Sequence, residues 1–144
     1  MKLNNDLKLT VEKDIVSTIE KVWEILTEPQ YIKEYLYGTD AISDWKEGSS
    51  LIFKGEWEGN AYQEKGTILE FQKPEKFSYS YFTLFFELPD LPENYAKIEN
   101  KLTEKNGIVT LQLTQTGFVS EEKLNHSIQN WNQCLEIIKN IAEK

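Results

Sequence analysis

The chain has 144 residues, with 16 Lys and Arg against 24 Asp and Glu, and it contains one cysteine. This length is typical of a single domain whose core needs no disulfide or metal to support it, and one cysteine excludes an internal disulfide. The formal net charge of −8 disfavours nucleic-acid binding, because phosphate backbones are bound by basic patches. We therefore expect one domain over residues 1–144 with no nucleic-acid partner.

The chain begins with a predicted strand and two short helices. Apolar and polar side chains alternate over residues 7–13, which is typical of a half-buried strand. Ser17 followed by Glu20 predicts a capping box at the start of a helix. Pro29 suits the first turn of a second helix, which would end near Tyr35. The apolar residues that share one face of the first helix are Ile19, Val22, Trp23 and Leu26.

Residues 51–116 predict several strands separated by turns. Turn residues stand at 58–60, 73–76 and 105–107, and the prolines in 88–92 cannot continue a strand because proline lacks a backbone N–H. Residues 61–72 show no clear alternation, which a bulge at Gly66 or burial on both faces would explain. The predicted inward residues of the last two strands are Ala96, Ile98, Asn100, Leu102, Val109, Leu111, Leu113 and Gln115.

A long amphipathic helix is predicted over residues 120–142. Ser120 is a suitable N-cap, and the acidic residues after it complement the positive end of the helix. Apolar residues recur at spacings of three and four, at Leu124, Ile128, Trp131, Leu135, Ile138 and Ala142. Consecutive strands joined by short turns favour an antiparallel sheet. The element order is therefore strand, two helices, about six strands and a long helix.

Four segments in this order resemble a known family. They are DIVSTIEKVWEILTEP at residues 14–29, DWKEG at 44–48, KGTILEFQKP at 65–74, and Asn130-Trp131 ahead of Leu135. Together they resemble the SRPBCC (START-like) superfamily, and within it the branch named after the Aha-type activator of heat-shock protein 90 ATPase. The resemblance covers about residues 8–142. It implies an α+β helix-grip (START/Bet v-like) fold, in which a curved antiparallel sheet of six to seven strands wraps around the C-terminal helix.

The main candidate site is a ligand cavity between the sheet and the last helix. Small-molecule pockets are mostly apolar and carry a few placed polar groups. Two amides interrupt predicted apolar faces, and a buried amide without a partner costs about 1–3 kcal/mol. Alternatively, the aromatic side chains form a packed core, and both amides are hydrated near strand ends. The predicted lining is Phe53, Trp57, Tyr79, Tyr81, Phe85, Asn100, Gln115, Trp131 and Leu135.

The sequence predicts no catalytic residue, metal site or cofactor. His126 falls on the exposed side of the last helix, and Cys134 follows no pattern that activates a thiol. Glu64 and Glu70 share the polar side of an ambiguous strand, and a change of register would place one of them inside the cavity. Trp45 would either cap one end of the sheet or lie exposed to a partner.

Three functions remain open at this stage. The first is a non-catalytic binding protein for a lipid, polyketide or aromatic metabolite. The second, implied by the resemblance, is a co-chaperone-like module, with residues 88–92 and Tyr95 as its exposed apolar surface. The third is a small cyclase or hydrolase that uses a cavity carboxylate or tyrosine. In each case we expect a cytoplasmic monomer or homodimer without membrane insertion, because no apolar segment is long enough to span a bilayer.

Overall fold

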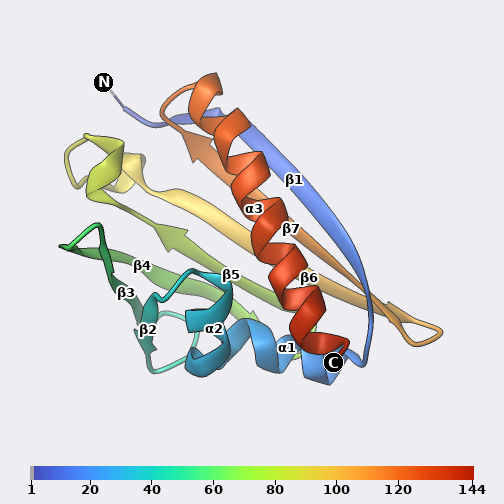
Figure 1. The fold of residues 1–144 in the computed structure, drawn as a ribbon. Coiled ribbons are helices and arrows are strands. Elements are labelled where there is room, and N and C mark those ends of the chain that lie inside the picture. Colours follow the sequence, from blue (N-terminus) through green and yellow to red (C-terminus); the bar gives the residue numbers. More distant parts are fainter. Residues whose placement is uncertain (1) are drawn as a thin grey trace.

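The computed structural model describes residues 2–144, apart from the side chain of Trp57. Its seven strands form one antiparallel sheet in the order β1-β7-β6-β5-β4-β3-β2, and the long helix α3 crosses one face of it (Figure 1). The strands are β1 (Asn4–Val16), β2 (Asp40–Ser43), β3 (Ser50–Trp57), β4 (Asn60–Gln72), β5 (Lys76–Tyr81), β6 (Ala96–Lys105) and β7 (Ile108–Phe118). The helices are α1 (Ile19–Thr27), α2 (Pro29–Tyr35) and α3 (Glu121–Ala142), with 3-10 turns η1 (Leu84–Phe86) and η2 (Pro92–Asn94). The predicted helix-grip fold is confirmed.

Hydroxyl side chains cap the starts of α1 and α3, whereas α2 has no side-chain cap, and the cap of α1 lies one residue later than predicted. Thr18, rather than Ser17, accepts a hydrogen bond from the Lys21 backbone N–H at 3.2 Å. The next free donor, the N–H of Ile19, is bound at 2.6 Å by the carboxylate of Glu104 on β6. This second partner comes from a distant strand, so the capping-box pattern could not reveal it.

The ambiguous strand β4 contains a bulge at a position other than the one predicted. The register between β4 and β5 shifts between Ile68 and Glu70, rather than at Gly66. Before the shift, Glu64 pairs with the inward-facing Phe53 of β3, and after it Glu70 lies beside Ser78 on the outer side. The bulge thus directs the two predicted carboxylates to opposite faces of the sheet. The short strand β2 was not predicted.

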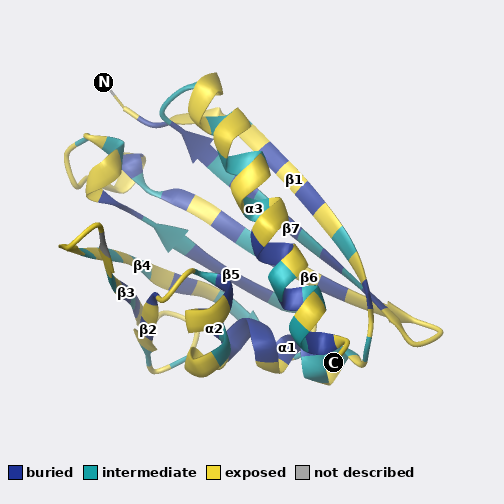
Figure 2. Ribbon diagram, in the orientation of Figure 1, coloured by how far each residue is buried: buried dark blue, intermediate teal, exposed yellow. Residues whose placement is uncertain are grey.

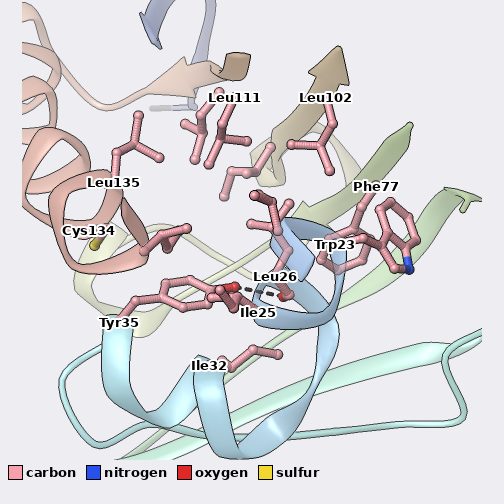
Figure 3. Packing of buried hydrophobic residues seen from close by; sticks show 14 of the residues in the cluster. Trp23, Ile25, Leu26, Ile32, Tyr35, Phe77, Leu102, Leu111, Cys134 and Leu135 are labelled. Carbon is pink, nitrogen blue, oxygen red and sulfur yellow. Dashed lines mark hydrogen bonds between the residues drawn. The ribbon is translucent and has the colours of Figure 1, made fainter. Parts of the chain in front are cut away.

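Apolar side chains from α1, α2, α3 and the sheet pack together at one end of the molecule (Figure 3). Trp23 on α1 contacts Phe71 and Phe77 with ring centroids 5.1 and 6.4 Å apart. The hydroxyl of Tyr35 donates a 2.8 Å hydrogen bond to the Leu26 carbonyl, which joins α2 to α1. We call this region, formed by α1, α2, residues 134–142 of α3 and the strand segments beneath them, the closed end.

The other half of α3 is only partly covered (Figure 2). Along the predicted apolar face, Leu135, Ile138 and Ala142 are buried, whereas Leu124, Ile128 and Trp131 are half-buried. We call the region formed by residues 121–131, η1, η2 and the nearby strand ends the open end. No helix among residues 2–144 is long and apolar enough to cross a membrane.

Candidate functional site

The inner face of the sheet carries a mixed aromatic and polar cluster where the closed end passes into the open end. The strand pairings place Tyr79 beside Ile98, Ile98 beside Gln115, and Phe77 beside Asn100. Because side chains alternate between faces, these paired residues share the face that α3 covers. We call this cluster the inner site and define it as Phe53, Glu64, Tyr79, Tyr81, Asn100, Gln115 and Trp131.

Three aromatic rings from β3 and β5 form the apolar part of the inner site. The ring centroid of Phe53 lies 5.7 Å from that of Tyr79 and 6.2 Å from that of Tyr81. Tyr79 also contacts Phe77, at 5.3 Å, which continues the aromatic packing into the closed end. Tilted contacts at these distances are the favourable arrangement for aromatic pairs. The alternation of side chains along β5 therefore places Tyr79 and Tyr81 in one wall of the site.

Trp131 connects α3 to the sheet through a polar contact. Its indole Nε1–H donates to the Gln115 side-chain oxygen at 2.8 Å, and the Gln115 amide nitrogen is 3.4 Å from the Gly117 carbonyl. Gln115 is 6% exposed, so water does not hydrate this amide freely. The contact fixes the position of the indole ring over the inner face and satisfies one of the two predicted amides.

Asn100 is the second buried amide, and it is only half satisfied. It is 4% exposed, and its amide nitrogen makes one long hydrogen bond, 3.4 Å, to the Phe77 carbonyl. Its side-chain oxygen has no hydrogen-bond partner and is the one such buried side-chain atom among the described residues. Most buried polar atoms in folded proteins have a partner, so this acceptor requires an explanation.

Glu64 is the one inner-site carboxylate, and it pairs with Phe53, whose ring contacts that of Tyr81. Burial, and after it the Glu64 carboxylate, raises the pKa of Tyr81 well above 10. Burial also raises the pKa of Tyr79, with smaller contributions from Cys134 and Glu64. Both hydroxyls are therefore neutral at physiological pH.

The position of Glu64 could have been deduced from the turn that precedes β4. Trp57 pairs with Asn60 across the two-residue turn Glu58-Gly59, and counting back along this register sets Glu64 opposite Phe53. Two-residue turns fix the register of a hairpin in this way. The turn residues at 58–60 are visible in the sequence, and the register of the strand follows from them.

Three of the predicted lining residues lie elsewhere or are not described. Phe85 does not follow Tyr81 along β5, because that strand ends at Tyr81 and Phe85 belongs to η1, where it is 67% exposed. Leu135 is fully buried in the closed end, on the side of α3 that faces the sheet. Trp57 ends β3, and its side chain is outside the described part of the structure.

The remaining candidate residues, Cys134, His126 and Trp45, lie outside the inner site. Cys134 is buried, and burial raises the pKa of its thiol to about 11, so it remains protonated at neutral pH. His126 is exposed on α3. Trp45 is half-buried, and its ring centroid lies 6.4 Å from Phe71 and 6.1 Å from Phe77, which fits the predicted cap.

The surface hollows of the protein lie away from the inner site. Within residues 2–144, no three His, Cys, Asp or Glu side chains are grouped to hold a metal ion. A hollow of about 470 Å³ lies on the outer face of the sheet, between strands β1, β7 and β6. A second, of about 500 Å³, lies beside Ile19 and Glu104. Neither hollow includes an inner-site residue.

Comparison with known proteins gives a consistent family. The family model described as Activator of Hsp90 ATPase homolog 1-like protein matches residues 17–143. The solution structure of ChR145 from Cytophaga hutchinsonii is 45% identical in sequence, with a TM-score of 0.82, and the match covers 98% of this chain and 95% of that one. Among curated proteins, none matches the chain.

More distant structures share the fold. The Aha1 dimer from Colwellia psychrerythraea is 14% identical, with a TM-score of 0.74 and coverage of 95% of this chain and 96% of that one. CalU16 from Micromonospora echinospora is 20% identical, with a TM-score of 0.68 and coverage of 91% and 73%. Identities this low establish a common architecture and carry no information on function.

Proposed function

Since this chain belongs to the family of Activator of Hsp90 ATPase homolog 1-like proteins, within the SRPBCC superfamily, we propose that its inner site binds a small apolar or amphipathic molecule. Lipids, polyketides and aromatic metabolites are the candidate ligands. The molecule would lie between the inner face of the sheet and the first half of α3, against Phe53, Tyr79, Tyr81 and Trp131. No step of this proposal requires a metal or a cofactor.

The unpartnered oxygen of Asn100 is the observation that carries the proposal. An amide buried to this degree on an apolar face costs about 1–3 kcal/mol if it stays unpaired, so a folded chain retains it at a cost. A ligand that hydrogen-bonds to this oxygen would remove the cost when it binds. Neighbouring inward residues Ile98 and Leu102 are apolar, which makes the amide an exception along its own strand.

The uneven cover of α3 supports an entry route at the open end. Leu124, Ile128 and Trp131 are half-buried although they continue the apolar face that is fully buried further along the helix. A ligand that slides beneath residues 124–131 would complete the burial of this face. Each Å² of apolar surface that the ligand covers would favour binding by about 25 cal/mol.

Native mass spectrometry of gently purified protein tests the proposal. We expect a retained small molecule of defined mass, or a mass shift after incubation with a library of lipids and aromatic compounds. A ligand at one hundred times its dissociation constant should also raise the free energy of unfolding by about 2.7 kcal/mol. Trp131→Ala and Tyr81→Ala should weaken that binding. Unaltered mass and stability with every compound would contradict the proposal.

A second candidate function rests on a separate surface. Leu84 and Phe85 in η1 are 77% and 67% exposed, and Leu91 in the following loop is 44% exposed. Apolar residues exposed together are a feature of protein-contact surfaces. This surface favours a co-chaperone-like role at a heat-shock protein 90 ATPase. The double variant Leu84→Ser with Phe85→Ser should then lose any stimulation of that ATPase, whereas Asn100→Leu should retain it.

A further inference from the structure

Asn100 offers a ligand one specific kind of hydrogen bond. Its amide nitrogen points to the Phe77 carbonyl, which can only accept, so the assignment of the two amide ends follows from the partner. The free end is therefore the oxygen, which is an acceptor. A ligand group must bring an O–H or N–H to satisfy it, and an ether, ketone or carboxylate oxygen would instead face another acceptor.

The other polar groups of the inner site do not reverse the preference for a ligand that donates a hydrogen bond. The Trp131 N–H is already bound by Gln115, and the nearby Glu64 carboxylate is one cause of the raised pKa of Tyr81, so that hydroxyl keeps its proton. The Tyr79 hydroxyl can donate or accept, so it does not discriminate between ligand groups. The remaining strong acceptors, Glu64 and Asn100, both favour a ligand that donates.

The charge distribution acts against anionic ligands. The chain contains no arginine, and the strand lysines Lys8, Lys54, Lys65, Lys97 and Lys101 alternate with the inward residues and lie on the outer face. Lys13 shares the inward side of β1, but its ammonium group forms a 2.8 Å ion pair with Glu136. A carboxylate at the inner site would thus lose its hydration without gaining a cation, and would lie near Glu64.

On the basis of the proposed function, we infer that the inner site selects a ring-bearing apolar molecule with an uncharged or cationic hydrogen-bond donor, such as a phenol or an aromatic amine, and discriminates against carboxylates. The aromatic wall of Phe53, Tyr79 and Tyr81 supplies contact with the ring. The Asn100 oxygen accepts the donor, and Glu64 supplies the negative charge that excludes an anion.

Three probes with one naphthalene ring system test this inference. They are 2-naphthol, which donates a hydrogen bond, 2-methoxynaphthalene, which only accepts, and 2-naphthoate, which is an anion. Binding is followed by isothermal titration calorimetry on the full chain. We expect 2-naphthol to bind about tenfold more tightly than 2-methoxynaphthalene, which is the size of one hydrogen bond to a buried group. We expect 2-naphthoate to bind more weakly than 2-naphthol, by about tenfold or more.

Two variants assign the selectivity to its residues. Asn100→Leu keeps the side-chain volume close to that of the amide but removes the acceptor, so 2-naphthol and 2-methoxynaphthalene should bind with equal affinity. Glu64→Gln removes the charge, so binding of 2-naphthoate should strengthen by about tenfold while the ratio between the two neutral probes persists. His126→Gln, at an exposed position on α3, is the control and should change none of the affinities.

The outcomes separate this inference from the proposal on which it rests. Equal affinity for all three probes, or tightest binding of 2-naphthoate, would overturn the selectivity and leave the binding function intact. A tenfold preference for 2-naphthol that persists in Asn100→Leu would also overturn it, because the donor would be recognised elsewhere. Failure of every probe and of the lipid and aromatic library to bind would overturn both.

Discussion

The two ends of the molecule use the same sheet and the same helix but differ in how completely their side chains are satisfied. At the closed end, Leu135 and Ile138 of α3 are buried against apolar strands and against α1. At the open end, the same helical face is half-buried, and the inner face of the sheet carries Gln115, Glu64 and, at the border with the closed end, Asn100. The closed end therefore supplies the stability, and the open end is where the proposed ligand would enter the inner site.

This contrast explains how one short chain can hold a site that is unfavourable for folding. An unpaired buried amide and an inward carboxylate both reduce the net gain from burial. The ring contacts among Trp23, Phe71 and Phe77 at the closed end involve neither the free Asn100 oxygen nor the Glu64 carboxylate. Strain or incomplete satisfaction at a functional site is commonly supported in this way by a well-packed region nearby.

The largest expected effect comes from making one truncation at each end of α3. Leu135→Ala should lower the free energy of unfolding by about 3 kcal/mol, because it leaves a cavity in a fully buried region. Leu124→Ala, the matched change on the half-covered part of the same helical face, should cost less than about 1 kcal/mol. Urea denaturation measures both. Equal losses would show that the two ends do not differ in packing.

Glycine substitutions near the open end test how easily the backbone of the sheet deforms there. A Cβ atom added at Gly66 would lie 1.7 Å from the Ser80 carbonyl oxygen, so Gly66→Ala must displace backbone and should cost about 2–3 kcal/mol. At Gly55, an added Cβ would meet the side-chain hydroxyl of Tyr62 at 2.3 Å, and that side chain can move. Gly55→Ala should therefore cost less. Equal tolerance of both changes in thermal denaturation would mean that the sheet deforms easily there.

The two buried amides should respond in opposite ways to substitution. Gln115→Leu should destabilise by about 1 kcal/mol, because the Trp131 N–H loses its acceptor. Asn100→Leu should leave the free energy of unfolding unchanged or raise it by up to about 1 kcal/mol, because it removes an atom that had no partner. Chemical denaturation in the absence of ligand distinguishes them. A large loss for Asn100→Leu would indicate that the amide is a structural requirement of the fold.

The smallest effect is expected on the outer face, which belongs to neither end. The Lys76 ammonium, and after it the Ser78 hydroxyl, lower the pKa of Glu70 below its ordinary value of 4.5. A lowered folded-state pKa stabilises the protein at pH above the unfolded value, and this contribution is lost as pH falls through the folded value. Glu70→Gln should thus be slightly less stable than the natural chain at pH 7, and the difference should vanish in acid. Urea midpoints between pH 7 and pH 3 measure it, with Glu75→Gln as the control.

The sequence by itself determined the fold and most of the inward-facing residues. Apolar spacing placed α3 and its Ser120 cap, and alternation gave the inward sets of β6 and β7, including both amides. These features depend on residues close together in the chain, where periods of 2 and 3.6 residues reflect burial directly. The turn at Asn106-Gly107 was predicted for the same local reason.

Only the tertiary structure decided how the site is divided and which polar groups are satisfied in it. The bulge between Ile68 and Glu70 set Glu64 inward and Glu70 outward, and the end of β5 at Tyr81 removed Phe85 from the wall. Whether an amide is satisfied depends on a partner far away in sequence, such as Trp131 for Gln115. Local propensity contains no information on such partners, so the difference between a satisfied Gln115 and a half-satisfied Asn100 emerges only when the sheet curves beneath α3.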